Sequence, residues 1–202
     1  YLLCRIADTI EDDIGLDNDQ KSRFHRMFVA IVEGSDSAED FAAQLFPLLS
    51  TRSLPAERDL VRNTPAVIRV MHGLSPPERA ALTQCVATMC KGMPEFQRNK
   101  SLAGLRDLEE LAEYCYYVAG DVGEMCTELF CLHVPELASR REAMLKLAVS
   151  FGQGLQMTNI LKDIWDDRAR GACWLPRDRQ VSGQSRADRQ GLRQSRQNRP
   201  ST

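Results

Sequence analysis

The sequence has few histidines, few aromatic residues and no long apolar run, and each shortage excludes a class of protein. Among 202 residues there are 3 histidines and 2 tryptophans, and no CxxC pair occurs, which excludes a zinc-finger domain. No apolar stretch reaches the roughly 18 residues that span a bilayer, and no signal-peptide pattern opens the chain. Sustained alternation of apolar and polar residues is also missing. The sequence therefore predicts a protein without strands or membrane spans.

Cysteine is present in an odd number of copies without the spacing of a metal or disulfide framework. This usage predicts a reducing, cytoplasmic setting, in which the protein could associate peripherally with the inner face of the cell membrane. Small buried core residues are the simplest interpretation of these thiols, and we assign none of them a function from the sequence. The seven are Cys4, Cys85, Cys90, Cys115, Cys126, Cys131 and Cys173.

Charge is unevenly distributed along the chain. Residues 177–202 contain seven arginines and two aspartates, a net charge of +5, which leaves −7 for residues 1–176 out of a total of −2. An acidic folded part argues against a nucleic-acid partner. Acidity of this kind suits a site that collects divalent cations and lets them hold an anionic substrate.

Helical periodicity and capping residues predict an all-α, single-domain bundle over residues 1–176. After Pro176 large apolar residues almost disappear, so we expect 177–202 to be a disordered tail whose deletion leaves the melting temperature unchanged. Ser75 and Glu78 form the clearest helix start in the chain. The expected helices cover about 1–14, 18–34, 37–49, 55–73 with a kink at Pro65, a segment from 75, 107–132, and 135–168 with a bend near Gly152 and Gly154.

Two of these helices carry a narrow acidic stripe. On the first, the stripe is formed at spacings of four, three and four by Tyr1, Arg5, Asp8 and Asp12. On the last, spacings of three, four and four produce a stripe of Gln156, Asn159, Asp163 and Asp167, which we expect on an otherwise buried helix.

One DxxxD pair alone would indicate only a solvated face. Two narrow acidic stripes on apolar helices are less easily explained, because aspartates one turn apart repel and are costly to bury. Magnesium ions would relieve that repulsion and bind substrate phosphates as well. Arg5 and Lys162 could neutralise further diphosphate oxygens. The pattern predicts ionisation of an allylic diphosphate in a helical cavity.

A third segment, residues 114–124, combines tyrosines with small residues inside a helix. Tyr114 and Val118 share a face, and Ala119, Gly120 and Gly123 remove side-chain bulk. The segment is compatible with a slot for a hydrocarbon chain or with close helix packing. Close packing is the better interpretation of this segment taken alone.

These motifs resemble the squalene/phytoene synthase family. The segment with Gly92 and Phe96, like the tyrosine motif, resembles squalene synthases, most of all bacterial ones, more than plant-type phytoene synthases. The resemblance covers nearly all of 1–176 through Arg5-Ile-Ala-Asp8-Thr-Ile-Glu-Asp12-Asp13, Tyr114-Cys-Tyr-Tyr-Val-Ala-Gly120, Gln156-Met-Thr-Asn159-Ile-Leu-Lys-Asp163-Ile-Trp-Asp-Asp167 and Arg170-Gly-Ala-Cys-Trp-Leu-Pro176.

The resemblance implies a class I isoprenoid synthase fold and a monomeric enzyme that joins two farnesyl diphosphates head to head. Magnesium would be held by Asp8, Asp12, Asn159, Asp163 and Asp167, and NADPH would be used if the product is squalene. The four aspartates and Tyr114 are the implied catalytic residues. Substrate contacts are implied for Arg5, Val118, Ala119, Gly120, Gln156, Asn159 and Lys162.

The sequence departs from the family at both ends, where expected helices are absent or replaced by the tail. We therefore expect the 202-residue chain alone to be weakly active or inactive. Gly152-Gln-Gly154 is not a dinucleotide fingerprint, because no strand precedes it. The alternative functions are a phytoene synthase acting on geranylgeranyl diphosphate, a terpene cyclase or chain-elongating enzyme, and a non-catalytic helical remnant.

Overall fold

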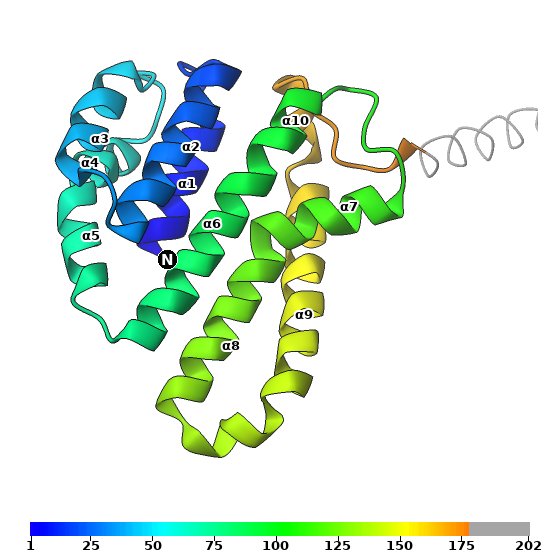
Figure 1. The fold of residues 1–202 in the computed structure, drawn as a ribbon. Helices are drawn as coiled ribbons and strands as arrows, with labels where there is room; N and C mark the ends of the chain where they lie inside the picture. The colour runs from blue at the N-terminus through cyan, green and yellow to red at the C-terminus, as the bar shows by residue number, and fades with distance from the viewer. Residues whose placement is uncertain (178–202) are drawn as a thin grey trace, which may run out of the picture. The chain divides into compact units, whose positions relative to one another are not determined.

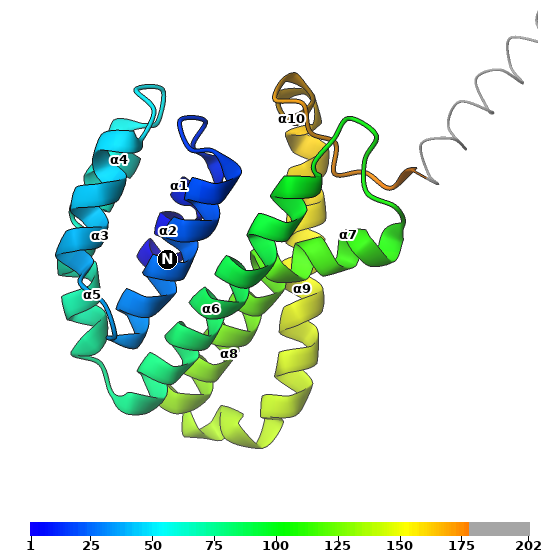
Figure 2. The same cartoon turned by 45° about the horizontal axis from the view of Figure 1, so that its top comes forward.

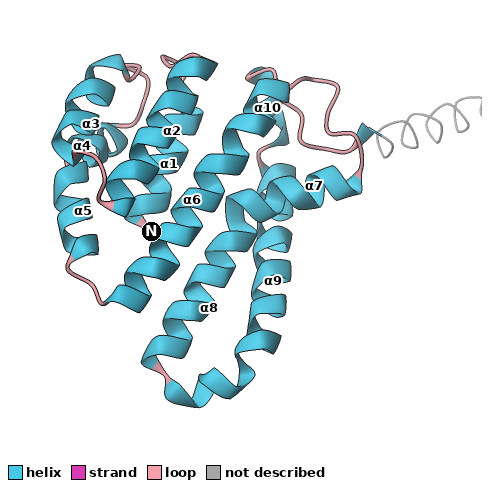
Figure 3. Cartoon of the chain, in the orientation of Figure 1, coloured by secondary structure: helices cyan, strands magenta, loops and turns pink. Residues whose placement is uncertain are grey.

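The computed structural model describes residues 1–177, and Figures 1 and 3 show helices connected by loops. Within this part the only β-type pairing is an isolated bridge between Leu105 and Pro176. The all-α fold class is thus confirmed. The α-helices are α1 (Leu2–Asp12), α2 (Asn18–Glu33), α3 (Ala38–Leu45), α4 (Pro55–Arg62), α5 (Thr64–His72), α6 (Pro76–Asn99), α7 (Leu108–Cys115), α8 (Asp121–His133), α9 (Arg141–Lys162) and α10 (Ile164–Ala169). Short 3-10 segments are Phe46–Leu48 and Pro135–Arg140, and a π-helical segment is Tyr116–Gly120.

The helix ends follow the capping chemistry of the sequence. Asp17 accepts a hydrogen bond from the backbone N–H of Gln20 at the start of α2, and Gly34 ends that helix with a left-handed φ of 82°. Ser37 accepts from the backbone N–H of Asp40 at 3.1 Å and begins α3. The Glu78 carboxylate accepts from the backbone N–H of Ser75 at 2.8 Å before α6.

Two segments predicted as single helices, one kinked at Pro65 and one bent near Gly152 and Gly154, are instead interrupted. The predicted helix 55–73 is divided at Asn63 into α4 and α5, because Pro65 lacks an N–H donor and suits the first turn of a new helix. The predicted helix 135–168 is divided at Asp163, whose φ of −98° and ψ of 10° interrupt the helix. Gly152 and Gly154, where a bend was predicted, lie within α9.

The chain forms two compact units. The first contains residues 1–99 and 114–156. In it α1 and α2 lie between α3 to α5 on one side and α6 on the other, as Figures 1 and 2 both show. Helix α8 packs along α6.

The core of the first unit lies where α1, α2, α3 and α6 meet. Phe24, Phe28 and Phe41 are fully buried there, and the rings of Phe28 and Phe41 stack with centroids 5.7 Å apart. From α1 the core receives Ile6 and Ile10, both with no exposed surface. Burial of one face of α1 fixes the direction in which its acidic stripe points.

The second unit contains residues 100–113 and 157 onward. Its loops are joined by backbone hydrogen bonds from Cys173 to Ser101 (3.0 Å) and from Arg177 to Leu105 (2.9 Å). Leu105 and Trp174 are among its buried residues. Arg177, predicted to begin the disordered tail, is therefore bound to the fold, and the rest of the tail prediction lies outside the described residues. Among helices in 1–177, none is long and apolar enough to span a membrane.

Candidate functional site

Helix α1 presents the first group of candidate residues. The Arg5 guanidinium donates to the Asp8 carboxylate at 3.3 Å and also forms an ion pair with Glu57 of α4. All three side chains are partly buried, with 22–31% of their surface exposed. Glu57 comes 52 residues after Arg5 in the sequence, and sequence reasoning did not find it because nothing local predicts which helix faces Arg5.

The carboxyl group of Asp8 is held in an unfavourable environment for a negative charge. Burial and the nearby Asp12 raise the pKa of Asp8 to about 6, against the opposing effect of Arg5. A second cation next to Asp8 and Asp12 would relieve this cost. This environment agrees with the repulsion expected between aspartates one turn apart on a helix. Tyr1, predicted to belong to the stripe, is 84% exposed.

The residues beside Asp12 are more deeply buried than the stripe itself. Glu11 and Asp13 are each 4% exposed. Asp13 accepts hydrogen bonds from the backbone N–H groups of Gly15 (2.7 Å) and Ser50 (3.1 Å), and the Glu11 carboxylate lies 3.9 Å from His25 Nδ1. These contacts attach the end of α1 to its neighbours and so position Asp12.

The tyrosine motif forms the π-helical segment Tyr116–Gly120. Such segments are rare and occur often at functional sites, because the wider turn redirects side chains. Tyr114 lies just before it and packs its ring against Phe96, with centroids 5.3 Å apart. Val118 is partly buried against the core cluster.

Neighbouring groups fill the space beside the small residues of this segment, so no cavity lies there. A Cβ atom on Gly123 would lie 2.5 Å from the carbonyl oxygen of Ala148, and one on Gly152 would lie 2.3 Å from that of Ala119. A Cβ on Gly120 would lie 2.9 Å from the Tyr116 ring. Close packing, the interpretation favoured for this segment taken alone, thus accounts for the lack of a side chain at Gly123 and Gly152. The predicted contact of Ala119 and Gly120 with substrate stays a prediction.

The second group of candidates lies at the end of α9 and in α10. Gln156 belongs to the first unit, while Asn159, Lys162, Asp163 and Asp167 belong to the second. Lys162 Nζ lies 3.4 Å from Asp163 Oδ2. The backbone N–H of Asp167 donates to the carbonyl of Asp163 at 2.9 Å, so the two aspartates stay one turn apart across the helix break.

The expectation of a buried helix around this second stripe is wrong. Leu155, Leu161 and Trp165 are 52%, 62% and 76% exposed. Among the predicted apolar neighbours of the stripe, only Ile160 is buried, with 4% of its surface exposed. Periodicity identified the apolar side of the helix correctly. It could not determine which part of that side is covered.

Each group supplies two aspartate carboxylates on successive turns, which are oxygen donors of the type that magnesium prefers. Within residues 1–177 no cluster of three or more histidine, cysteine, aspartate or glutamate side chains is arranged to hold one ion. The donor set of α1 fits magnesium because burial and the neighbouring Asp12 leave the negative charge of Asp8 in need of a compensating cation. Gly152 and Gly154 lie inside a helix, so they form no dinucleotide-binding turn, as predicted.

One further acidic residue in the tyrosine motif was not among the candidates. Asp121 is 3% exposed, and burial raises its pKa to about 8. A signal for it existed in the sequence, because this aspartate directly follows three small or apolar residues, Val118, Ala119 and Gly120, within a predicted helix.

Known proteins resemble this chain along most of its length. The sequence model of the squalene/phytoene synthase family matches residues 1–199. A squalene synthase of Gibberella zeae is 32% identical over 183 residues, which are 88% of this chain and 36% of that protein. A squalene synthase of Candida albicans is 30% identical over 180 residues, 88% of this chain and 38% of that protein.

Solved structures show the same relationship. A complex of TcSQS with the ligand BPH1237 has a TM-score of 0.70 and 25% identity, and a complex of TcSQS with E5700 has a TM-score of 0.63 and 26% identity. Each match covers 88% of this chain and 48% of the other. The chain thus spans less than half the length of the proteins it matches. The relatives named are fungal, and the resemblance to bacterial members stays a prediction. The motifs, the all-α isoprenoid synthase fold and these matches together establish that the chain belongs to the squalene/phytoene synthase family.

Proposed function

We propose that the protein is a magnesium-dependent prenyltransferase that condenses two farnesyl diphosphates head to head. The product is presqualene diphosphate, which the same protein reduces to squalene with NADPH or converts to dehydrosqualene without it. The partly buried Asp8, with Arg5 beside it and Asp12 one turn further along α1, is the observation that carries this proposal. These residues form the charge pattern that a metal-held diphosphate requires.

The side chains of the chain itself would bind and orient the substrates. Magnesium, when bound, would supply positive charge that stabilises the departing diphosphate. Arg5 would exchange part of its pairing with Asp8 and Glu57 for hydrogen bonds to diphosphate oxygens. Asp163 and Asp167, with Gln156 and Asn159, would bind the second diphosphate, and Lys162 would add a cation there.

The reaction at carbon requires apolar side chains that exclude water and a group that can accept one proton. Ionisation of one farnesyl diphosphate releases diphosphate and leaves an allylic cation, which the double bond of the second attacks. Loss of one proton then closes the cyclopropane, and the Tyr114 hydroxyl is the candidate group to assist that loss. Val118 would lie along the hydrocarbon and help to exclude the water that would quench the cation.

The protein works as a monomer. Because squalene is apolar and dissolves in membranes, the protein associates peripherally with a membrane. The matched relatives are squalene synthases, which favours farnesyl over geranylgeranyl diphosphate as substrate.

Product analysis by mass spectrometry tests the proposal. The protein, with whatever natural segments flank residues 1–202, is incubated with farnesyl diphosphate and Mg²⁺, with and without NADPH. We expect presqualene diphosphate or dehydrosqualene without NADPH, squalene with it, and no product when Mg²⁺ is chelated. Cyclic products of one farnesyl unit, elongated diphosphates, or no turnover by folded protein would contradict the proposal.

A further inference from the structure

The part of α6 that contains Gly92 and Phe96 contacts the tyrosine motif, and the function proposed above gives these contacts no role. Gly92 and Phe96 lie one turn apart on α6, and both are buried. The Phe96 ring packs against Tyr114, with centroids 5.3 Å apart, and against Tyr117, with centroids 6.1 Å apart. All four residues belong to the first unit. One face of α6 therefore holds two tyrosines of the motif.

The Tyr117 ring lies directly on the α6 backbone at Gly92. A Cβ atom at position 92 would be 2.1 Å from Cγ of Tyr117, and 2.3 and 2.6 Å from its two Cδ atoms. Carbon atoms in contact prefer separations of about 3.5–4.0 Å, so any side chain at this position would displace the ring. The lack of a side chain at Gly92 thus gives Tyr117 its place on α6.

The position of Tyr117 affects Tyr114 through the helix that carries both. Tyr117 belongs to the π-helical segment Tyr116–Gly120, and Tyr114 lies three residues before it. A π-helical turn changes the direction of the side chains around it, so the contact that fixes this turn on α6 also fixes where Tyr114 points. Because Phe96 packs against both tyrosine rings, a displacement of the Tyr117 ring would also reach the Tyr114 ring.

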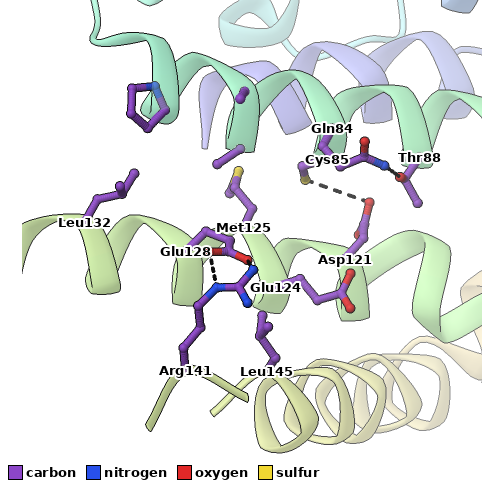
Figure 4. Close-up of a pocket in the computed structure, with 13 residues that line it drawn as sticks. Gln84, Cys85, Thr88, Asp121, Glu124, Met125, Glu128, Leu132, Arg141 and Leu145 are labelled. Carbon is purple, nitrogen blue, oxygen red and sulfur yellow. Dashed lines mark hydrogen bonds and ion pairs between the residues drawn. The ribbon is translucent and has the colours of Figure 1, made fainter. Parts of the chain in front are cut away.

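Tyr116, the neighbour of Tyr117 in the same segment, has polar contacts of a different kind. Its hydroxyl donates a hydrogen bond to the Glu124 carboxylate of α8 at 2.9 Å, and its ring lies 5.6 Å from that of Tyr117. Glu124 lines a pocket of about 530 Å³ between α6 and α8, as Asp121 does (Figure 4). The Tyr116 hydroxyl can therefore be removed without a change in the contact of Tyr117 with α6.

We propose that Tyr117, packed on Gly92, is a positioning residue that fixes the direction of the Tyr114 hydroxyl. This inference rests on the proposed function, in which that hydroxyl assists the loss of one proton as the cyclopropane closes. When the hydroxyl is misplaced, ionisation of farnesyl diphosphate continues but closure becomes slower. Water then adds to the allylic cation, one proton leaves, and an allylic alcohol forms in place of presqualene diphosphate.

Product analysis tests this inference through the ratio of head-to-head products to allylic alcohol. Tyr117→Leu should lower the ratio about tenfold to a hundredfold, the scale of loss that a misplacement of about 1 Å causes, while the KM for farnesyl diphosphate changes little. Tyr117→Phe keeps the ring on Gly92 and should retain the wild-type ratio. Tyr116→Phe is the matched control in the same segment and should retain it as well.

A double variant separates positioning from a general loss of structure. Tyr114→Phe combined with Tyr117→Leu should give the ratio of Tyr114→Phe alone, because the direction of a missing hydroxyl no longer matters. A ratio lower by the full factor of Tyr117→Leu would mean that the two residues act independently, and the proposal would be wrong. Gly92→Ala pushes the ring aside without removing it and should repeat the effect of Tyr117→Leu. Wild-type ratios in both of these variants would also contradict the proposal.

The NMR signals of the Tyr114 ring, assigned with Tyr114→Phe, provide a readout that needs no turnover. They should shift in Tyr117→Leu and in Gly92→Ala, and stay close to their wild-type positions in Tyr116→Phe. Unchanged Tyr114 signals in Tyr117→Leu would overturn the positioning role. A wild-type protein that makes no head-to-head product would instead overturn the proposed function, so the two failures can be told apart.

Discussion

At the scale of single residues, the buried aspartates of this protein differ in how many hydrogen-bond donors contact their carboxylates. Asp13 accepts from two backbone N–H groups and from the Ser53 hydroxyl. Asp121 accepts from one backbone N–H, that of Val122 at 2.7 Å, and from the weak thiol donor of Cys85. The few donors around Asp121 do not offset its desolvation, so its neutral form is favoured.

The raised pKa of Asp121 predicts a pH dependence of stability. Burial raises this pKa from 3.8 to about 8, so between these values the folded protein holds a proton that the unfolded chain has lost. The free energy of unfolding should therefore fall as pH rises through this range, by about 3–5 kcal/mol. Asp121→Asn removes the effect. Its advantage over wild type should grow from pH 5 to pH 8 and then level off.

Urea unfolding of both proteins at several pH values measures this difference, and contributions from other titrating groups cancel when wild type and variant are compared. Parallel stability curves over pH 5–8 would show that Asp121 titrates normally.

At the scale of helices, the approach of α8 to α9 depends on two glycines. Gly123→Ala or Gly152→Ala would put a methyl group 2.5 or 2.3 Å from a backbone oxygen of the opposite helix. Each change should lower the free energy of unfolding by about 1–3 kcal/mol, because backbone cannot move aside as a flexible side chain can.

Gly154→Ala is the matched control in the same helix, since nothing lies within 4 Å of the added Cβ. It should stabilise the protein by about 0.5–1 kcal/mol through helix propensity. Chemical denaturation of the three variants measures these changes in the free energy of unfolding. Equal effects at all three positions would mean that the contact between the helices does not explain why Gly123 and Gly152 are glycines.

At the scale of the whole molecule, the proposed function assigns Asp163 to the binding of the second diphosphate. Asp163→Asn keeps the size of the side chain and removes its charge. Under the proposed function we expect the rate of farnesyl diphosphate consumption to fall by about 10² or more, with only partial recovery at high Mg²⁺. The melting temperature should change little, because Asp163 is half exposed.

Asp166→Asn provides the comparison, because Asp166 is an exposed neighbour outside the stripe, and its rate should stay close to that of the parent. Initial rates of the three proteins, measured at several Mg²⁺ concentrations, give the answer. Similar rates for Asp163→Asn and the parent would remove Asp163 from the site.

The sequence by itself determined the helical class, most helix starts and the two aspartate pairs, because periodicity and capping are local properties of the backbone. It also predicted that Arg5, Asp8 and Asp12 share one face of α1, which follows from 3.6 residues per turn. Only the tertiary structure decided that Glu57 pairs with Arg5, that Cys85 lies beside Asp121, and that α9 fills the space beside Gly123. Those outcomes depend on which helices pack together and on what each contact removes from water, and residues far apart in the sequence determine both.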